Sequence, residues 1–369
     1  MDCRTLMHQN TPVAEVKIDA DMIVGFSRVF IPDLLPIGTR IDNPMMKSQE
    51  FYRIKEWVKS RSIPKERQGI ERIQKVLQIT PNDAFLRSLA VSLSDTYWIK
   101  EDGCPLQWED VNYFDNGFDP IFANIISGGS TAVSFSPTPD FTTDGTMSKF
   151  WIQSGGNHFL YKIDTQYQNQ ESANEVVVSR ISRELGILTT PYEQAFLSDK
   201  TPVCVCPSYI KDQYTDYING VALKHAHIGD FSNFSLVRYI ERDLGLKKEL
   251  DQIRLIDVLF YNTDRHERNI GFSIKNNDIH TIQMIPAFDN GHCLGVVPVN
   301  KNDDMKLFYK KREDLVFDIE SEADLDEERF LSILKEVYES FEVPEERFCI
   351  ASEILSDGCK LLEDRSKER

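Results

Sequence analysis

The stretch that decides the fold is Asn262-Thr263-Asp264-Arg265-His266-Glu267-Arg268-Asn269. Before it, apolar residues recur at helical spacing from Ile253 to Phe260, which predicts a helix that runs into this stretch and stops there. After it, apolar and small residues alternate from Ile270 to Ile274, and a period of two is typical of a half-buried strand. The stretch is therefore expected to be a polar loop between a helix and a strand.

A hairpin and a second acidic segment are predicted to follow this strand. Asn276-Asn277-Asp278 has the composition of a tight turn, and His280 to Ile285 that of the returning strand. Ala287-Phe288-Asp289-Asn290-Gly291 comes directly afterwards. Elements in this order can hold two carboxylates, Asp264 and Asp289, and the carboxamide of Asn269 around one position.

Two carboxylates and a carboxamide are the groups that phosphoryl transfer from a magnesium nucleotide requires. In this interpretation Asp264 orients or deprotonates the attacking hydroxyl. Asn269 binds a metal ion through its side-chain oxygen, and Asp289 bridges the metal ion and the phosphates. His266 and Arg268 are expected to support the loop. Asp, Asn and Gly are also the usual residues of turns, so the prediction depends on the order of the elements and not on any single residue.

The spacing of these residues is that of two kinase motifs. Asp264 and Asn269 match D-x-x-x-x-N of kinase catalytic loops, and 288–291 stand where a kinase has its metal-binding D-F-G. One departure is clear, because Thr263 precedes the aspartate where protein kinases have H-R. Here Arg265 and His266 follow it instead.

N-T-D-R-H-x-x-N-x-G-F at 262–272, followed by P-A-F-D-N-G at 286–291, resembles the HipA-like serine/threonine kinases of bacterial toxin modules, which include compact CtkA-type members. The resemblance extends from about Ser92 to about Gly295. It implies an α+β, two-lobed protein-kinase-like fold with an N-terminal α/β appendage, ATP and Mg²⁺ as cofactors, and a protein substrate. Family members often work beside a DNA-binding antitoxin, so such a partner is also implied. D-R-H-x-x-N resembles the catalytic loop of phosphatidylinositol kinases as well.

A lysine in an otherwise apolar strand is the second candidate feature. Lys162 lies within Phe159 to Ile163, and an unpaired buried ammonium group is costly, so it needs an acidic partner. The helix predicted from Glu171 to Leu185 supplies Glu175, with Glu171 as the alternative. Lysine and glutamate in these positions match the pair that holds the α- and β-phosphates in kinases.

Residues 127 to 149 are rich in Ser, Thr, Gly and Pro and precede this strand. Small residues let backbone amides approach phosphate oxygens, which favours a loop over the nucleotide; a flexible linker is the alternative. The resemblance places the family's phosphate loop here, with Thr143, Asp144, Gly145 and Lys149 as nucleotide-binding residues. It also implies a regulatory autophosphorylation site at Thr142, Thr143 or Ser148.

Composition limits the partners. The formal net charge is −17, from 59 acidic and 42 basic residues, and a surface so negative repels nucleic acids and anionic membranes in bulk. The sequence has no apolar run of about 18 residues and no signal pattern at its start, which predicts a cytoplasmic protein. Seven scattered cysteines argue against a disulfide framework, and Cys204 and Cys206 are expected to pack within a strand.

Three segments are predicted: a small sheet plus helices at 1–91, a kinase N-lobe with the phosphate loop at 92–210, and a mainly helical C-lobe with the catalytic loop at 211–369. The predicted function is that of an ATP- and Mg²⁺-dependent serine/threonine protein kinase, autophosphorylating and a component of a toxin module. Two alternatives stay open. One is a nucleotide-binding pseudokinase that acts as an interaction module; the other is a lipid kinase, which the acidic composition disfavours.

Overall fold

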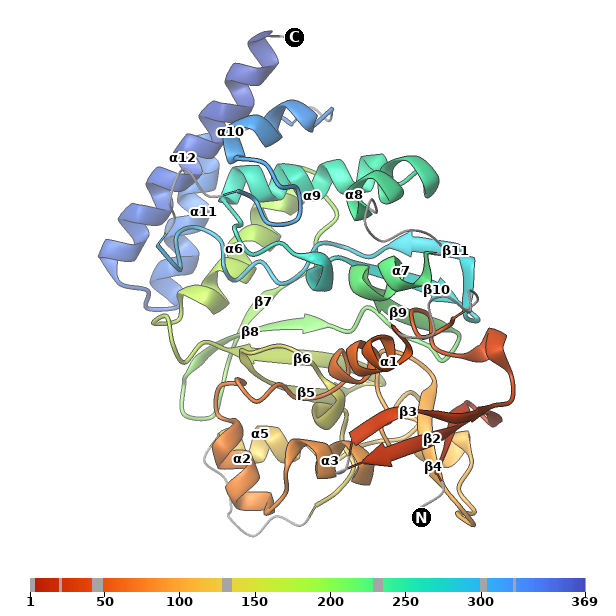
Figure 1. The fold of residues 1–369 in the computed structure, drawn as a ribbon. Helices are drawn as coiled ribbons and strands as arrows, with labels where there is room; N and C mark the ends of the chain where they lie inside the picture. Colours follow the sequence, from red (N-terminus) through yellow and green to blue (C-terminus); the bar gives the residue numbers. More distant parts are fainter. Residues whose placement is uncertain are drawn as a thin grey trace. The chain divides into compact units, whose positions relative to one another are not determined.

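The computed structural model describes residues 4–19, 22–41, 49–127, 135–227, 235–298, 304–320 and 323–368 (Figure 1). The chain forms two compact units, each built from three segments. Unit 1 comprises Met1–Leu160, Ser208–Phe234 and Phe272–Ile282. Unit 2 comprises Tyr161–Pro207, Ser235–Gly271 and Gln283–Arg369. The chain passes between the units several times, so neither unit is a continuous stretch of sequence.

Unit 1 contains a four-stranded antiparallel sheet with strand order β3-β2-β1-β4. Its strands are β1 (Arg4–His8), β2 (Thr11–Asp19), β3 (Met22–Val29) and β4 (Tyr97–Glu101). One face is apolar and packs on helices, in a cluster that includes Leu6, Val16, Ile54 and Phe85. The sequence predicted a small sheet within 1–91 but not the strand β1.

The helices of unit 1 are short. They are η1 (Pro32–Leu34), α1 (Glu50–Lys59), α2 (Ile70–Leu77), α3 (Pro81–Arg87), α4 (Trp108–Val111), α5 (Ile121–Ile126), η3 (Pro139–Thr142) and α7 (Gly220–Ala226). Thr80 begins α3 because its side chain accepts a hydrogen bond from the Asp83 amide, at 3.1 Å. Residues 128–134 of the predicted phosphate loop lie outside the described residues.

The predicted hairpin after the polar loop is confirmed. It consists of β10 (Gly271–Lys275) and β11 (Asp278–Met284), and β9 (Thr215–Asn219) completes a sheet with the order β11-β10-β9. Asn276 and Asn277 form the turn, with φ of 51° and 57°. Asparagine tolerates this left-handed conformation better than other side chains do, which explains the Asn-Asn pair at this position.

The lysine strand also forms as predicted. β5 (Ser148–Ser154) and β6 (Asn157–Ile163) make a hairpin whose turn is Gly155-Gly156, both with positive φ. In unit 2 the sheet continues from the end of β6 to β8 (Pro202–Pro207) and then β7 (Glu193–Phe196). Cys204 and Cys206 are buried in β8 with free thiols, in agreement with strand packing.

Unit 2 is otherwise helical (Figure 1). Its helical elements are α6 (Gln170–Glu184), α8 (Leu236–Arg238), the π-helix η5 (Tyr239–Asp243), α9 (Lys247–Phe260), η6 (Glu267–Asn269), α10 (Arg312–Leu315), η7 (Val316–Asp318), α11 (Glu327–Ser340) and α12 (Glu345–Glu368). Helix α6 packs on α11 and the end of β8, and α9 packs on α12. Most of α6 and the last turns of α9 are buried, so both helices are fixed by packing. Helix α6 carries Glu175, and α9 leads into the polar loop at 262–269.

The helix predicted from Glu171 to Leu185 is confirmed as α6. The predicted helix that runs into the polar loop is α9, and it ends at Phe260 because Tyr261 takes a left-handed conformation, with φ of 52°. Among the residues that the structure describes, every helix is too short or too polar to span a lipid bilayer. The three sequence segments at 1–91, 92–210 and 211–369 remain a prediction.

Candidate functional site

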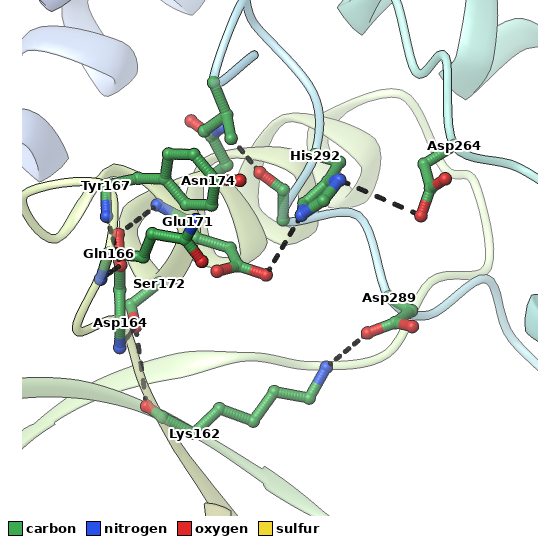
Figure 2. A network of polar contacts seen from close by, with 12 residues as sticks. Lys162, Asp164, Gln166, Tyr167, Glu171, Ser172, Asn174, Asp264, Asp289 and His292 are labelled. Atoms are coloured by element: carbon green, nitrogen blue, oxygen red, sulfur yellow. Dashed lines mark hydrogen bonds and ion pairs between the residues drawn. The ribbon is translucent and has the colours of Figure 1, made fainter. Parts of the chain in front are cut away.

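Lys162 lies near the C-terminal end of β6 and is almost completely buried. Its Nζ is 2.6 Å from Glu175 Oε1. It is also 3.0 Å from Asp289 Oδ1, a contact that Figure 2 shows. Burial alone would lower the pKa of Lys162, but the two carboxylates raise it well above its ordinary value. The ion pair predicted between Lys162 and Glu175 is therefore present, and Glu171, the alternative, has a different contact.

Glu175 connects the lysine to the acidic turn. While Oε1 holds Lys162, Oε2 accepts a hydrogen bond from the Asn290 amide at 2.9 Å. Burial raises the pKa of Glu175, and the ammonium of Lys162 opposes this effect. Both carboxylate oxygens are thus used, and one side chain of α6 joins β6 to the residue that follows Asp289.

Asp164 sets the geometry between β6 and α6 (Figure 2). Its Oδ1 accepts hydrogen bonds from the amides of Gln166 and Tyr167, at 2.8 and 2.7 Å, and its Oδ2 accepts one from the amide of Glu171 at 2.9 Å. A carboxylate bound to amides at the start of a helix is stabilised by the helix dipole as well. Asp164, two residues after Lys162, therefore fixes the start of α6 at Gln170 relative to β6.

The polar loop after α9 is held by its own side chains. Asn262 Oδ1 accepts a hydrogen bond from the Asp264 amide at 3.0 Å. Asn269 is buried; its Oδ1 accepts from the His266 amide at 2.7 Å and its Nδ2 donates to Asp264 O at 3.0 Å. An amide oxygen has two lone pairs, so Asn269 Oδ1 retains one after this contact.

Arg265 joins the polar loop to the acidic turn, a role that the sequence did not reveal. Its fully buried guanidinium donates to Asp257 Oδ1 at 3.0 Å, to Asn290 Oδ1 at 2.6 Å and to Phe288 O at 2.8 Å. It also donates to Asn269 O at 3.2 Å. The sequence signal was Asp257, a charged residue on the apolar face of a buried helix, which requires a cation nearby.

Two further side chains, His292 and Lys306, contact Asp264 and were also missed. His292 lies between two carboxylates, with Nε2 3.4 Å from Glu171 Oε1 and Nδ1 3.8 Å from Asp264 Oδ2 (Figure 2). The hydrogen bond with Glu171 is the main cause that raises the pKa of His292. On the other side, Lys306 Nζ is 2.5 Å from Asp264 Oδ1. Lys306 is far along the chain from every motif, so no local pattern indicated it.

The oxygen donors suit a magnesium ion. Asp289 has a half-exposed carboxylate that already holds a cation, the ammonium of Lys162. Asn269 retains a free lone pair, and both ligands are hard oxygen donors of the kind that Mg²⁺ prefers. Among the described residues no group of three or more His, Cys, Asp and Glu side chains forms a metal site. Mg²⁺ in nucleotide sites is typically held by one or two protein ligands plus phosphates and water, so this small donor set fits.

The predicted phosphate-loop residues lie in unit 1, where 135–149 form a hydrogen-bonded turn. Thr143 Oγ1 donates to Pro139 O at 2.7 Å, and the Arg67 side chain donates to the carbonyls of Thr143 and Gly145. Asp144 Oδ1 accepts from the Gly145 amide at 2.7 Å, and Lys149 Nζ donates to Asp144 O at 3.0 Å.

Gly145 is required in this turn. It has φ of +102°, a backbone conformation that other residues rarely adopt, so a side chain there would be strained. Of the three candidate autophosphorylation residues, Thr142 and Ser148 are buried, and the Thr142 hydroxyl donates to Val91 O at 2.8 Å. Thr143 is the most accessible of the three. The roles of Thr143, Asp144, Gly145 and Lys149 in nucleotide binding remain predictions.

Comparison with known proteins gives structural relatives only. The sequence matches none of the protein families with which it was compared and no curated protein. The structure is similar to HipA of Shewanella oneidensis MR-1, from a toxin–antitoxin complex with HipB and its operator DNA. The identity is 12%, the TM-score is 0.57, and the similarity covers 98% of this chain and 97% of HipA.

A second similar structure is the proinflammatory kinase CtkA of Helicobacter pylori, with 16% identity and a TM-score of 0.46, over 60% of this chain and 94% of CtkA. The similarity to HipA shows the fold: this chain has a HipA-like, protein-kinase-like α/β fold. At 98% coverage it takes in the segment before Ser92, where the sequence motifs gave no resemblance.

Proposed function

We propose that this protein is a cytoplasmic, ATP- and Mg²⁺-dependent serine/threonine protein kinase of the HipA-like type. The observation that carries the proposal is one connected network in unit 2. Lys162 contacts Glu175 and Asp289, Glu175 contacts the Asn290 amide, and Arg265 ties that turn to the loop of Asp264 and Asn269. A fold alone does not determine function, so the proposal depends on this arrangement of side chains.

In the proposed reaction Lys162 binds the α- and β-phosphates of ATP. It is charged, buried and fixed by Glu175, so little rearrangement is needed when the phosphates arrive. Asp289 and Asn269 would hold Mg²⁺. When bound, this ion neutralises the negative charge on the phosphate oxygens. Thr143, Asp144, Gly145 and Lys149 of unit 1 are proposed nucleotide-binding residues as well, through backbone amides and the lysine ammonium group.

Asp264 orients the substrate hydroxyl and accepts its proton. The hydroxyl oxygen forms a bond to the γ-phosphorus while the bond to the β,γ-bridging oxygen breaks, and ADP leaves with that electron pair. The side chain of Asp264 is about one third exposed, so a hydroxyl on another molecule can reach it. Most of the rate enhancement then comes from positioning and charge stabilisation.

The experiment is phosphoryl transfer from labelled ATP in the presence of Mg²⁺, to the protein itself and to an added mixture of proteins. The parent should transfer label to serine or threonine, and Asp264→Asn should not. Asparagine preserves the size of the side chain but cannot accept the proton. Nucleotide binding without transfer by the parent would instead support a pseudokinase, and label on a lipid would support a lipid kinase.

We also propose a DNA-binding antitoxin as the partner and a toxin as the biological role. The support is the HipA structure, which is a complex with HipB and operator DNA. With a net charge of −17, this chain would contact DNA through such a partner and not by itself. Expression of the parent should arrest growth and Asp264→Asn should relieve the arrest; growth arrest by both proteins to the same extent would contradict the role.

A further inference from the structure

Lys306 is the cation nearest to Asp264. Its Nζ lies 2.5 Å from Asp264 Oδ1, and its side chain is 57% exposed. The imidazole of His292 also faces this carboxylate but is farther away, with Nδ1 3.8 Å from Oδ2. Lys162, the buried lysine of the network, is held by Glu175 and Asp289. Among the described residues, an exposed ammonium group, that of Lys306, therefore lies in direct contact with the proposed base.

This position matters because of where the transferred group must be. The attacking hydroxyl has to lie within hydrogen-bond distance of Asp264, roughly 2.6–3.2 Å, and the phosphorus is adjacent to that oxygen during transfer. Negative charge is spread over three equatorial oxygens of the phosphoryl group at that stage. A cation 2.5 Å from Asp264 Oδ1 is thus within a few ångströms of those oxygens.

We propose that Lys306 is a further catalytic residue, whose ammonium group leaves Asp264 when ATP binds and contacts the γ-phosphoryl group through its transfer. The proposal rests on the proposed kinase function and deepens it. The flexible four-carbon stem of lysine permits the movement, because the side chain is exposed and not packed in the core. A γ-phosphate carries more charge than a single carboxylate, and an exposed ion pair is weak enough to exchange.

The same movement prepares Asp264. The Lys306 ammonium group contacts Asp264 Oδ1, the oxygen that should receive the hydroxyl proton. When the Lys306 side chain moves so that its ammonium group contacts the γ-phosphoryl group, Asp264 Oδ1 becomes available to the hydroxyl. The positive charge then lies beside the phosphoryl group that the hydroxyl attacks. The loop at 262–269 contains no lysine, so the ammonium group in contact with Asp264 comes from another segment, that of Lys306.

The test compares Lys306→Met and Lys306→Arg with Lys310→Met in the full-length protein. Lys310 is a matched control: it is four residues away, similarly exposed, and its Nζ is bound to Asp318 at 2.7 Å instead of to Asp264. Binding of ATP and of ADP with Mg²⁺ is measured by calorimetry, and kcat and KM by label transfer. Lys306→Met should bind ATP about tenfold more weakly, bind ADP like the parent, and lose about 10²-fold or more in kcat. Lys306→Arg should recover much of the ATP affinity and of kcat, and Lys310→Met should behave like the parent.

Equal losses of ATP and ADP affinity in Lys306→Met would overturn the proposal, since no contact would then be specific to the γ-phosphoryl group. Transfer by this variant at the parent's rate or faster would also overturn it, because Lys306 would then only block Asp264. The binding measurement does not depend on turnover. A parent that transfers no label, together with a selective loss of ATP affinity in Lys306→Met, would refute the kinase function while the γ-phosphoryl contact stands.

Discussion

Arg265 Nη2 donates a hydrogen bond to Asn290 Oδ1 at 2.6 Å, and this contact joins the loop that carries Asp264 to the turn that carries Asp289. The same guanidinium is bound to Asp257 on α9, so three segments of unit 2 meet at one buried side chain. Burial alone would lower the pKa of Arg265, but Asp257 more than offsets it and the pKa is raised. The charge that organises the proposed site is therefore permanent at every ordinary pH.

Arg265→Met should lower the free energy of unfolding and abolish phosphoryl transfer. The substitution leaves Asp257 as an unpaired buried carboxylate, and removal of one member of a buried ion pair typically costs about 3–5 kcal/mol. Arg329→Met is the control, because the pair of Arg329 with Glu184 is exposed on both sides and such pairs contribute about 0–1 kcal/mol. Denaturant unfolding of both variants measures the difference. Equal stabilities would contradict the central role of Arg265.

Glu175→Gln should weaken ATP binding more than Glu171→Gln does. Glutamine at 175 can still accept from the Asn290 amide but cannot neutralise Lys162, which then shifts towards Asp289. Glu171 is on the same helix one turn earlier and contacts His292 instead of Lys162. The affinity for ATP, measured by calorimetry with Mg²⁺, separates the two variants. If Glu171→Gln had the larger effect, Glu171 would be the partner of the phosphate-binding lysine.

The predictable parts of the site are those set by short segments. The Asn269 contacts lie within the polar loop, and Lys162 needed an acidic partner that the next helix supplied. The Arg265–Asn290 and Lys306–Asp264 contacts join residues 25 and 42 positions apart, and such distances are closed only by the packing of whole helices. Local periodicity therefore could not reveal them.

The same reasoning applies to the fold. The hairpin at 270–285 has its turn residues and both strands close together, so composition was sufficient to predict it. Strand β1 is only five residues long, and its partner β4 lies about ninety positions later in the sequence. On its other side β1 pairs with the adjacent strand β2. Five residues are too few for a clear alternation, and alternation within one strand does not specify that a distant strand such as β4 lies beside it.

Stability should fall between about pH 4 and pH 7 because of Asp140. Burial raises the pKa of this carboxyl group to about 7, although the Trp151 amide and the Thr138 hydroxyl donate to it. In the unfolded chain the pKa is near 3.9, so between these values the folded form binds a proton that the unfolded form does not. Stability is then full below about pH 4 and is lost as pH rises through 7.

Asp140→Asn should remove this part of the pH dependence, since asparagine is neutral and can still accept from the Trp151 amide. Thermal unfolding of parent and variant at pH 5 and pH 8 measures it, and other titrating groups cancel in the difference. The melting temperature of the variant should rise relative to that of the parent between pH 5 and pH 8. A constant difference between the two proteins would mean that Asp140 is ionised in the folded state.

Gly358→Ala has two opposite effects on stability, and their relative sizes decide whether the variant is more or less stable than the parent. Alanine favours a helix interior over glycine by about 1 kcal/mol, and Gly358 lies inside the long helix α12. A Cβ atom there would lie 2.2 Å from Leu259 O and 2.7 Å from Arg312 Nη2, closer than atoms can approach. The carbonyl belongs to the backbone of α9, so the helices must separate, and overpacking of this kind costs about 1–3 kcal/mol or more.

The steric term should therefore win, with a lower melting temperature in Gly358→Ala. Separation of the helices would also break the hydrogen bonds from Arg312 to Val258 O and Ile354 O, which hold the last turn of α9 in place. Because α9 leads directly into Asp264, phosphoryl transfer should fall together with stability. Cys349→Ala, at an exposed position of α12, is the control and should change neither. A higher melting temperature in Gly358→Ala would show that α12 can move away from α9 without cost, and that the position of Asp264 does not depend on their contact.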